Sequence, residues 1–73
     1  MASYEVKSEI TGTVCKVTVN IGDHVAEDDP LVFVESMKME IPVVAPRGGR
    51  VTEIRVAEGD SIGEGDVAAI LEV

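Results

Sequence analysis

Valine and isoleucine recur along the chain in a pattern that predicts β-strands. Apolar residues alternate with polar ones through Val14, Val17, Val19 and Ile21 and again through 51–56, a period that turns one face of a strand toward a core. Two unbroken apolar runs, 31–34 and 67–71, are short and lie between acidic or glycine-containing turns, so we expect buried strands there. Turn residues recur too often for a helix of ordinary length. The predicted fold class is all-β.

The sequence repeats itself after a shift of 37 positions. Each copy contains a glycine, an alternating segment, a Gly-Asp turn, an acidic turn and a buried run. A copy of this size cannot bury its own apolar face, and two copies are too few for a solenoid, so the copies must pack on each other. The identities are Gly12 with Gly49, Val14 with Val51, Val19 with Val56, Gly22 with Gly59, Asp23 with Asp60, Glu27 with Glu64, Asp29 with Asp66 and Glu35 with Glu72.

The repeat also predicts the architecture. Two like sheets that face each other about an approximate two-fold axis would form a flattened β-barrel or sandwich in which strands exchange between the halves. Glu35 ends the first copy and Gly49 opens the second, so the residues between them join the two halves. Under the shift of 37 positions, this joining segment corresponds to the end of the chain after Glu72. We therefore expect a central hairpin and the two termini at opposite ends of a single domain, residues 1–73.

Charge and cysteine content narrow the function classes. Fourteen acidic against six basic side chains give a net charge of −8, which repels nucleic acid and anionic lipid and favours a soluble monomer. No charged-then-apolar leader and no apolar run of about 20 residues is present. Cys15 and His24 are the only cysteine and histidine, so we expect neither a disulfide nor a metal site. We expect Cys15 to be a small buried residue and the protein to be cytoplasmic. A chain this short has no room for an enzyme's substrate cleft.

The segment that joins the halves breaks a local rule. It runs from the buried strand through Glu35-Ser36-Met37-Lys38-Met39-Glu40 into Ile41-Pro42-Val43-Val44, so the chain must reverse near Met37 and Lys38. Two-residue hairpin turns need positive φ and favour Asn-Gly, which neither Met nor Lys replaces readily. Strain in such a turn would cost about 1–3 kcal/mol, and a turn that departs from its usual residues indicates a functional site.

The side chains around this turn suggest recognition by another protein. Large apolar residues at an exposed tip are unusual, and flexible thioethers at Met37 and Met39 would let a partner enzyme grip both sides of Lys38. Glu35 and Glu40 flank the tip. They would complement a basic rim on a partner, or simply keep an edge strand soluble.

The motif Glu35-Ser36-Met37-Lys38-Met39 resembles the attachment motif of biotin carboxyl carrier domains, and the chain as a whole resembles free-standing bacterial members of the biotinyl/lipoyl domain family. Further similarity lies in Gly22-Asp23, Ala45-Pro46, Gly49-Arg50-Val51 and Gly59-Asp60. The resemblance implies a barrel-sandwich hybrid of two quasi-symmetric four-stranded antiparallel sheets. It also implies that a biotin protein ligase attaches biotin to Lys38 and recognises Glu35, Ser36, Met37, Met39 and Glu40.

In that family the carrier is not an enzyme. The resemblance implies that biotin on the lysine stem moves carboxyl groups between the biotin carboxylase and carboxyltransferase components, while the carrier contributes placement of the lysine. The ligase must remove the proton from the ammonium group, because only the neutral amine is a nucleophile.

Two other functions stay open on sequence alone. A lipoyl carrier, or one that accepts both biotin and lipoate, shares the fold and a glutamate three residues before its lysine, although its usual flanks are Asp and Ala rather than Met37 and Met39. An unmodified hybrid-barrel adaptor of the kind found in membrane-fusion proteins also shares the fold. Such modules lack Met-Lys-Met and carry inserted helical hairpins at the joint, which is short here.

Overall fold

The computed structural model describes residues 2–73, none of which lies in a helix. The predicted all-β class is confirmed. Its strands are β1 (Ser3–Lys7), β2 (Gly12–Val17), β3 (His24–Val25), β4 (Pro30–Ser36), β5 (Met39–Val44), β6 (Gly49–Ile54), β7 (Ser61–Ile62) and β8 (Val67–Glu72).

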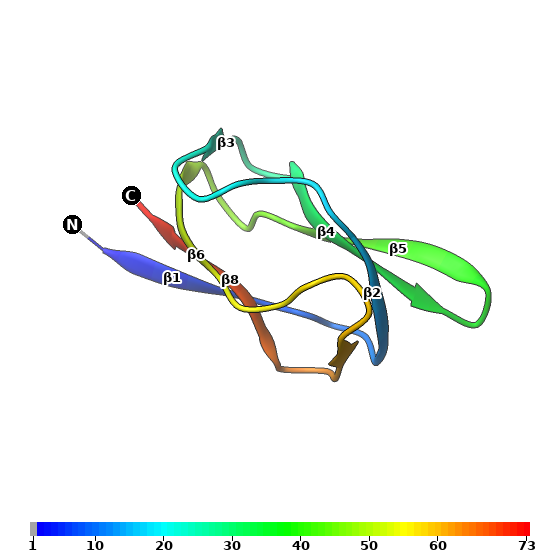
Figure 1. Cartoon of the computed structure of the whole chain (residues 1–73). Helices are drawn as coiled ribbons and strands as arrows, with labels where there is room; N and C mark the ends of the chain where they lie inside the picture. The colour runs from blue at the N-terminus through cyan, green and yellow to red at the C-terminus, as the bar shows by residue number, and fades with distance from the viewer. Residues whose placement is uncertain (1) are drawn as a thin grey trace.

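The strands form two four-stranded antiparallel sheets, ordered β1-β8-β6-β3 and β5-β4-β2-β7 (Figure 1). A shift of 37 positions carries β1 to β5, β2 to β6, β3 to β7 and β4 to β8, so the second order is the first one with its strands exchanged for their counterparts. Each sheet therefore contains two strands from residues 2–36, the first half, and two from residues 39–73, the second half. The expected strand exchange and the barrel-sandwich of quasi-symmetric sheets are confirmed.

The two-fold relation extends to single hydrogen bonds. Val14 N donates to Asp60 O over 2.8 Å, and the counterpart Val51 N donates to Asp23 O over the same 2.8 Å. The pairing of β2 with β4 shifts register at Cys15, as the pairing of β6 with β8 does at the equivalent Thr52. Such bulges bend a strand and increase its twist. Each half's Gly-Asp turn is thus bonded to a strand of the other half.

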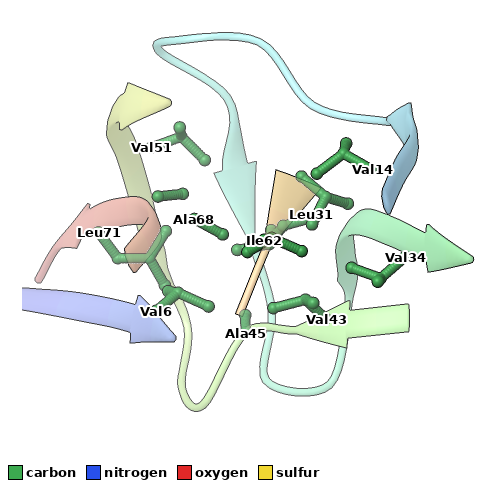
Figure 2. Close-up of a cluster of buried hydrophobic side chains, with 12 residues drawn as sticks. Val6, Val14, Leu31, Val34, Val43, Ala45, Val51, Ile62, Ala68 and Leu71 are labelled. Atoms are coloured by element: carbon green, nitrogen blue, oxygen red, sulfur yellow. The ribbon is translucent and has the colours of Figure 1, made fainter. Parts of the chain in front are cut away.

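Valine, isoleucine, leucine and alanine fill the space between the sheets (Figure 2). Burial of apolar surface contributes roughly 25 cal/mol per Å², and both halves supply it. Ser8 is the buried polar residue among those described, and its Oγ donates to Ile10 O over 2.7 Å, which offsets the cost of burying the hydroxyl. The core residues are Val6, Val14, Leu31, Val32, Val34, Val43, Ala45, Val51, Ile62, Ala68, Ala69 and Leu71.

Two expectations about burial were wrong. The first alternating segment does not continue to Ile21, because β2 ends at Val17 and a turn begins at Asn20, whose N–H donates to Asp23 Oδ2 over 2.9 Å; Ile21 is 66% exposed. Cys15 is half-buried rather than buried. It occupies the bulge, and its Sγ donates to Phe33 O over 3.3 Å.

The molecule is elongated, with extents of 37 × 19 × 18 Å. In Figure 1 the termini lie at the left and the β4–β5 hairpin at the right. Ala2 and Val73 hydrogen-bond to each other, as the symmetry requires, since they are the counterparts of the paired residues Met39 and Ser36. The hairpin and the termini lie at opposite ends, as predicted. Across residues 2–73 the structure offers no helix of the length and apolarity needed to cross a membrane.

Candidate functional site

The hairpin between β4 and β5 closes in two residues. Ser36 pairs with Met39, and Met37 and Lys38 form the turn with φ of 52° and 63°. Two consecutive central residues with positive φ are the mark of a type I′ turn, whose twist matches that of the flanking strands. These φ angles confirm the predicted conflict between turn type and residue type. A residue with a Cβ in the left-handed region typically costs about 1–2 kcal/mol.

Pairing below the tip holds this turn in place. Val34 pairs with Ile41 and Val32 with Val43, and three of these four side chains are buried while Ile41 is half-buried. On its other side β4 pairs with β2 from Thr13 to Val17. The base of the hairpin is therefore part of the core, which fixes where the tip projects.

Lys38 projects into solvent between two apolar side chains. Met37 is 92% exposed and Met39 63% exposed, and Lys38 is exposed as well. The other lysines are held in ion pairs: Lys7 Nζ lies 3.8 Å from Glu5 Oε1, and Lys16 Nζ lies 3.5 Å from Glu40 Oε1. Within residues 2–73 Lys38 is in no ion pair. The amine at the tip is thus open to another protein.

The two carboxylates beside the tip oppose each other. Glu35 and Glu40 are direct cross-strand partners, an arrangement in which like charges are destabilising. Lys16 offsets part of this repulsion through its ion pair with Glu40, and its Nζ lies 5.8 Å from the centre of the Phe33 ring. Glu35 is in no ion pair within the described chain, which makes it the more available charge for a partner.

All six predicted site residues lie on this one hairpin. Glu35, Met37, Lys38, Met39 and Glu40 are exposed, and Ser36 is half-buried at the closing pair. The contact of Lys16 with Glu40 could not be predicted from the sequence, because it crosses from β2 over β4 to β5 and depends on register. No local sequence pattern predicts this ion pair.

Pro42 protects the edge of the hairpin, a role that was not predicted from the sequence. It pairs with Phe33. Hydrogen-bonded and non-hydrogen-bonded pairs alternate along an antiparallel hairpin, and counting from the hydrogen-bonded closing pair Ser36 and Met39 makes Phe33 and Pro42 a non-hydrogen-bonded pair. The backbone nitrogen of Pro42 therefore points away from β4, to the free edge of β5. Proline has no N–H to offer an added strand. Its confinement to edge strands was the available signal.

A groove of about 550 Å³ lies between the two edge strands β1 and β5. Its walls are counterparts under the two-fold relation but differ in character: Glu5, Lys7 and Glu9 face Pro42, Val44 and Pro46. The groove lining includes neither Met37 nor Lys38. Lys38 therefore stands clear of this hollow.

The chemistry available at the tip is that of a presented amine. Among residues 2–73 no group of three or more His, Cys, Asp or Glu side chains is placed to hold a metal ion. The carboxylates nearest in sequence, Glu35 and Glu40, stand on the strands below the turn. The geometry suits a lysine that is modified by an external enzyme.

Comparison with known proteins finds relatives that match nearly the whole chain. A family model described as biotin-requiring enzyme matches residues 2–71. The biotinylated protein TB7.3 homolog of Mycobacterium leprae is 45% identical over 67 residues, which cover 92% of this chain and 94% of that protein. The biotin/lipoyl attachment protein of Bacillus subtilis is 45% identical over 62 residues, or 85% of each chain.

The fold also matches solved structures of much longer proteins. The crystal structure of Kluyveromyces lactis urea carboxylase superposes with a TM-score of 0.93 and 33% sequence identity. The match covers 99% of this chain but 6% of that one. The same barrel-sandwich thus occurs as a small part of a large enzyme.

Proposed function

The chain belongs to the biotin/lipoyl family, and on that premise we propose that it is a biotin carrier domain, acylated on Lys38 by a biotin protein ligase. Biotin on this lysine carries carboxyl groups from a biotin carboxylase component to a carboxyltransferase component. The carrier itself catalyses neither step and works as a monomer in the cytoplasm. Glu35, Ser36, Met37, Met39 and Glu40 form the surface that the ligase recognises.

One observation carries this proposal: Lys38, which is in no ion pair with any residue from 2 to 73, lies in a two-residue turn and has an exposed methionine on each side in the sequence. A rigid pair of sheets that holds the amine at a defined point reduces the orientational freedom lost when the ligase docks. Similarity to named biotinylated and biotin/lipoyl attachment proteins over nearly the whole chain supports the same assignment.

Replacing the three lysines one at a time tests the site. Lys38→Ala should abolish biotin incorporation by a bacterial biotin protein ligase, measured by avidin blotting and by intact mass. Lys7→Ala and Lys16→Ala are matched controls, since each removes one exposed ammonium group from a strand, and both should be labelled like the parent chain. Circular dichroism should be unchanged in all three, because none of these side chains is buried.

The outcome that contradicts the site is equally direct. Labelling that persists in Lys38→Ala and disappears in Lys7→Ala or Lys16→Ala would move the attachment point to another lysine. No labelling of the parent chain by the ligase would remove the biotin carrier function itself.

A lipoyl or dual carrier is the second candidate, and the name of the Bacillus subtilis relative favours it. Both acyl groups form an amide with the same lysine and make the formal net charge of −8 one unit more negative. They differ in mass. Intact mass of the chain after incubation with a biotin ligase and, separately, with a lipoate ligase distinguishes biotin, lipoate and dual acceptance.

A further inference from the structure

Within residues 2–73, the exposed sulfur atoms belong to the two residues next to Lys38 in the sequence. Cys15, Met37 and Met39 are the sulfur-containing residues within 2–73. The Cys15 thiol is half-buried and donates to Phe33 O. Met37 and Met39 are 92% and 63% exposed. Because an oxidant must reach the sulfur atom, these two thioethers are more open to it than the Cys15 thiol.

We propose that Met37 and Met39 are sites of reversible oxidation to the sulfoxide, and that the oxidised tip is a poor substrate for the biotin ligase. The inference rests on the proposed function, because it concerns the same recognition surface. It adds a second covalent modification of the hairpin, one that controls the first.

The oxidant is a peroxide, and the step balances. A sulfur lone pair attacks one oxygen of hydrogen peroxide, so that the S–O bond forms and the O–O bond breaks. The hydroxide that departs takes the proton from the oxygen now bonded to sulfur and leaves as water. Sulfur loses two electrons and the peroxide gains them. A methionine sulfoxide reductase reverses the change: two of its thiols become a disulfide, and the oxygen leaves as water.

The chemical change acts where docking needs apolar contact. A thioether is a flexible apolar group that fills irregular pockets, whereas the sulfoxide carries a strong hydrogen-bond acceptor. Burying that acceptor in a pocket built for a thioether leaves it without a partner, which weakens binding. Met37 and Met39 are the sequence neighbours of Lys38 and both are exposed, so a ligase that encloses the lysine is expected to meet both sulfoxides.

The fold itself should tolerate the modification. Neither methionine belongs to the buried cluster between the sheets, and the closing pair of the hairpin uses only the backbone of Met39. Oxidation therefore separates recognition from folding, since it changes the surface that a partner contacts and leaves the core unchanged.

The experiment treats the unmodified full chain with hydrogen peroxide, removes the peroxide with catalase, and compares biotin ligase kcat/KM before and after. Tryptic cleavage after Lys7, Lys16 and Lys38 places Met1, Met37 and Met39 in three separate peptides, so mass spectrometry assigns each sulfoxide. We expect Met37 to be oxidised at least as fast as Met39, and kcat/KM to fall about tenfold or more. Treatment with a methionine sulfoxide reductase and dithiothreitol should restore it.

Two variants separate the methionines from Cys15. Met37→Leu with Met39→Leu removes both thioethers at similar volume, and its ligase kcat/KM should be unaffected by peroxide. Cys15→Thr places at the bulge the residue found at the equivalent Thr52, and it should lose activity on oxidation just as the parent does. Where the leucine variant is itself a poor substrate, recovery of the oxidised parent by the reductase still decides the question.

The inference and the proposed function fail in different ways. Equal kcat/KM for the oxidised and unoxidised chains, or a peroxide effect that the reductase does not reverse, overturns the inference and leaves the carrier function intact. Absence of labelling in the unoxidised chain overturns the carrier function.

Discussion

The Gly22-Asp23 turn and the Met37-Lys38 turn both reverse the chain through residues with positive φ, yet they are built from opposite chemistry. Gly22 has φ of 97° and no Cβ to strain, and Asp23 accepts a hydrogen bond from Asn20 N–H over 2.9 Å. The symmetric turn repeats this arrangement, with Ala57 N–H donating to Asp60 over 2.9 Å. At the hairpin, two residues with full side chains adopt φ of 52° and 63°.

The difference shows that the hairpin tip keeps particular side chains at the expense of an unstrained backbone conformation. Glycine meets the conformational demand of the Gly-Asp turns, where side chains contribute only local hydrogen bonds. The hairpin would be more stable with Asn-Gly, but it would then present no amine. Strain at the tip is thus tied to the presence of Lys38, as expected of functional positions that depart from local rules.

Substitution at Gly22 should have the largest effect on stability. Gly22→Val forces a β-branched residue into positive φ, and we expect a loss of about 2 kcal/mol in the free energy of unfolding, measured by urea denaturation. A Cβ at Gly22 would meet nothing within 4 Å, so the experiment isolates the backbone conformation from crowding.

Gly48→Ala is the matched control, because Gly48 lacks a positive φ and its added Cβ would come no closer than 3.4 Å to Val25 O. Its stability should change by less than about 0.5 kcal/mol. If Gly22→Val were as stable as the parent, conformational demand would not explain the glycine.

Changing the flanks of Lys38 should have an intermediate effect, on recognition rather than on folding. Met37→Asp with Met39→Ala installs the flanks usual in lipoyl carriers, and we expect biotin ligase kcat/KM to fall about tenfold, equivalent to about 1.4 kcal/mol. Acceptance of lipoate from a lipoate ligase should rise. Ile21→Ala removes an exposed apolar side chain far along the chain from the tip and should leave both activities unchanged. Unaltered biotinylation of the double variant would deny the methionines a role in recognition.

Relieving the turn should produce the smallest effect and the opposite sign. Met37→Asn with Lys38→Gly supplies the residues that a type I′ turn favours, and we expect the free energy of unfolding to rise by about 1 kcal/mol. Met37→Ala with Lys38→Ala removes the same side chains but keeps residues with a Cβ in positive φ, so its stability should stay near that of the parent. Equal stability of the two double variants would mean that the turn stores no strain.

Sequence alone determined the repeat, the strand class and the position of the tip. Alternating and continuous runs of Val, Ile and Leu specify strands because side-chain periodicity is a local property. The coincidence of Gly12 with Gly49 and of Gly22 with Gly59 determined the two-fold relation. Met37 and Lys38 stood out because they violate a turn rule that can be applied to four residues in isolation.

Tertiary structure decided what depends on pairing. The exchange that puts β3 beside β6 and β7 beside β2, the bulges at Cys15 and Thr52, and the ion pair between Lys16 and Glu40 all join residues distant in sequence. β1 was not predicted as a strand, because it lies before Gly12, where the first copy of the repeat begins. Its counterpart β5 lies between the two copies, so the repeat did not point to either strand. Register arises when two sheets bury one shared core, since a slip by a single residue would turn the apolar face outward. The free-energy cost of such a slip exists only when both halves are folded together, so register cannot be predicted from a local sequence pattern.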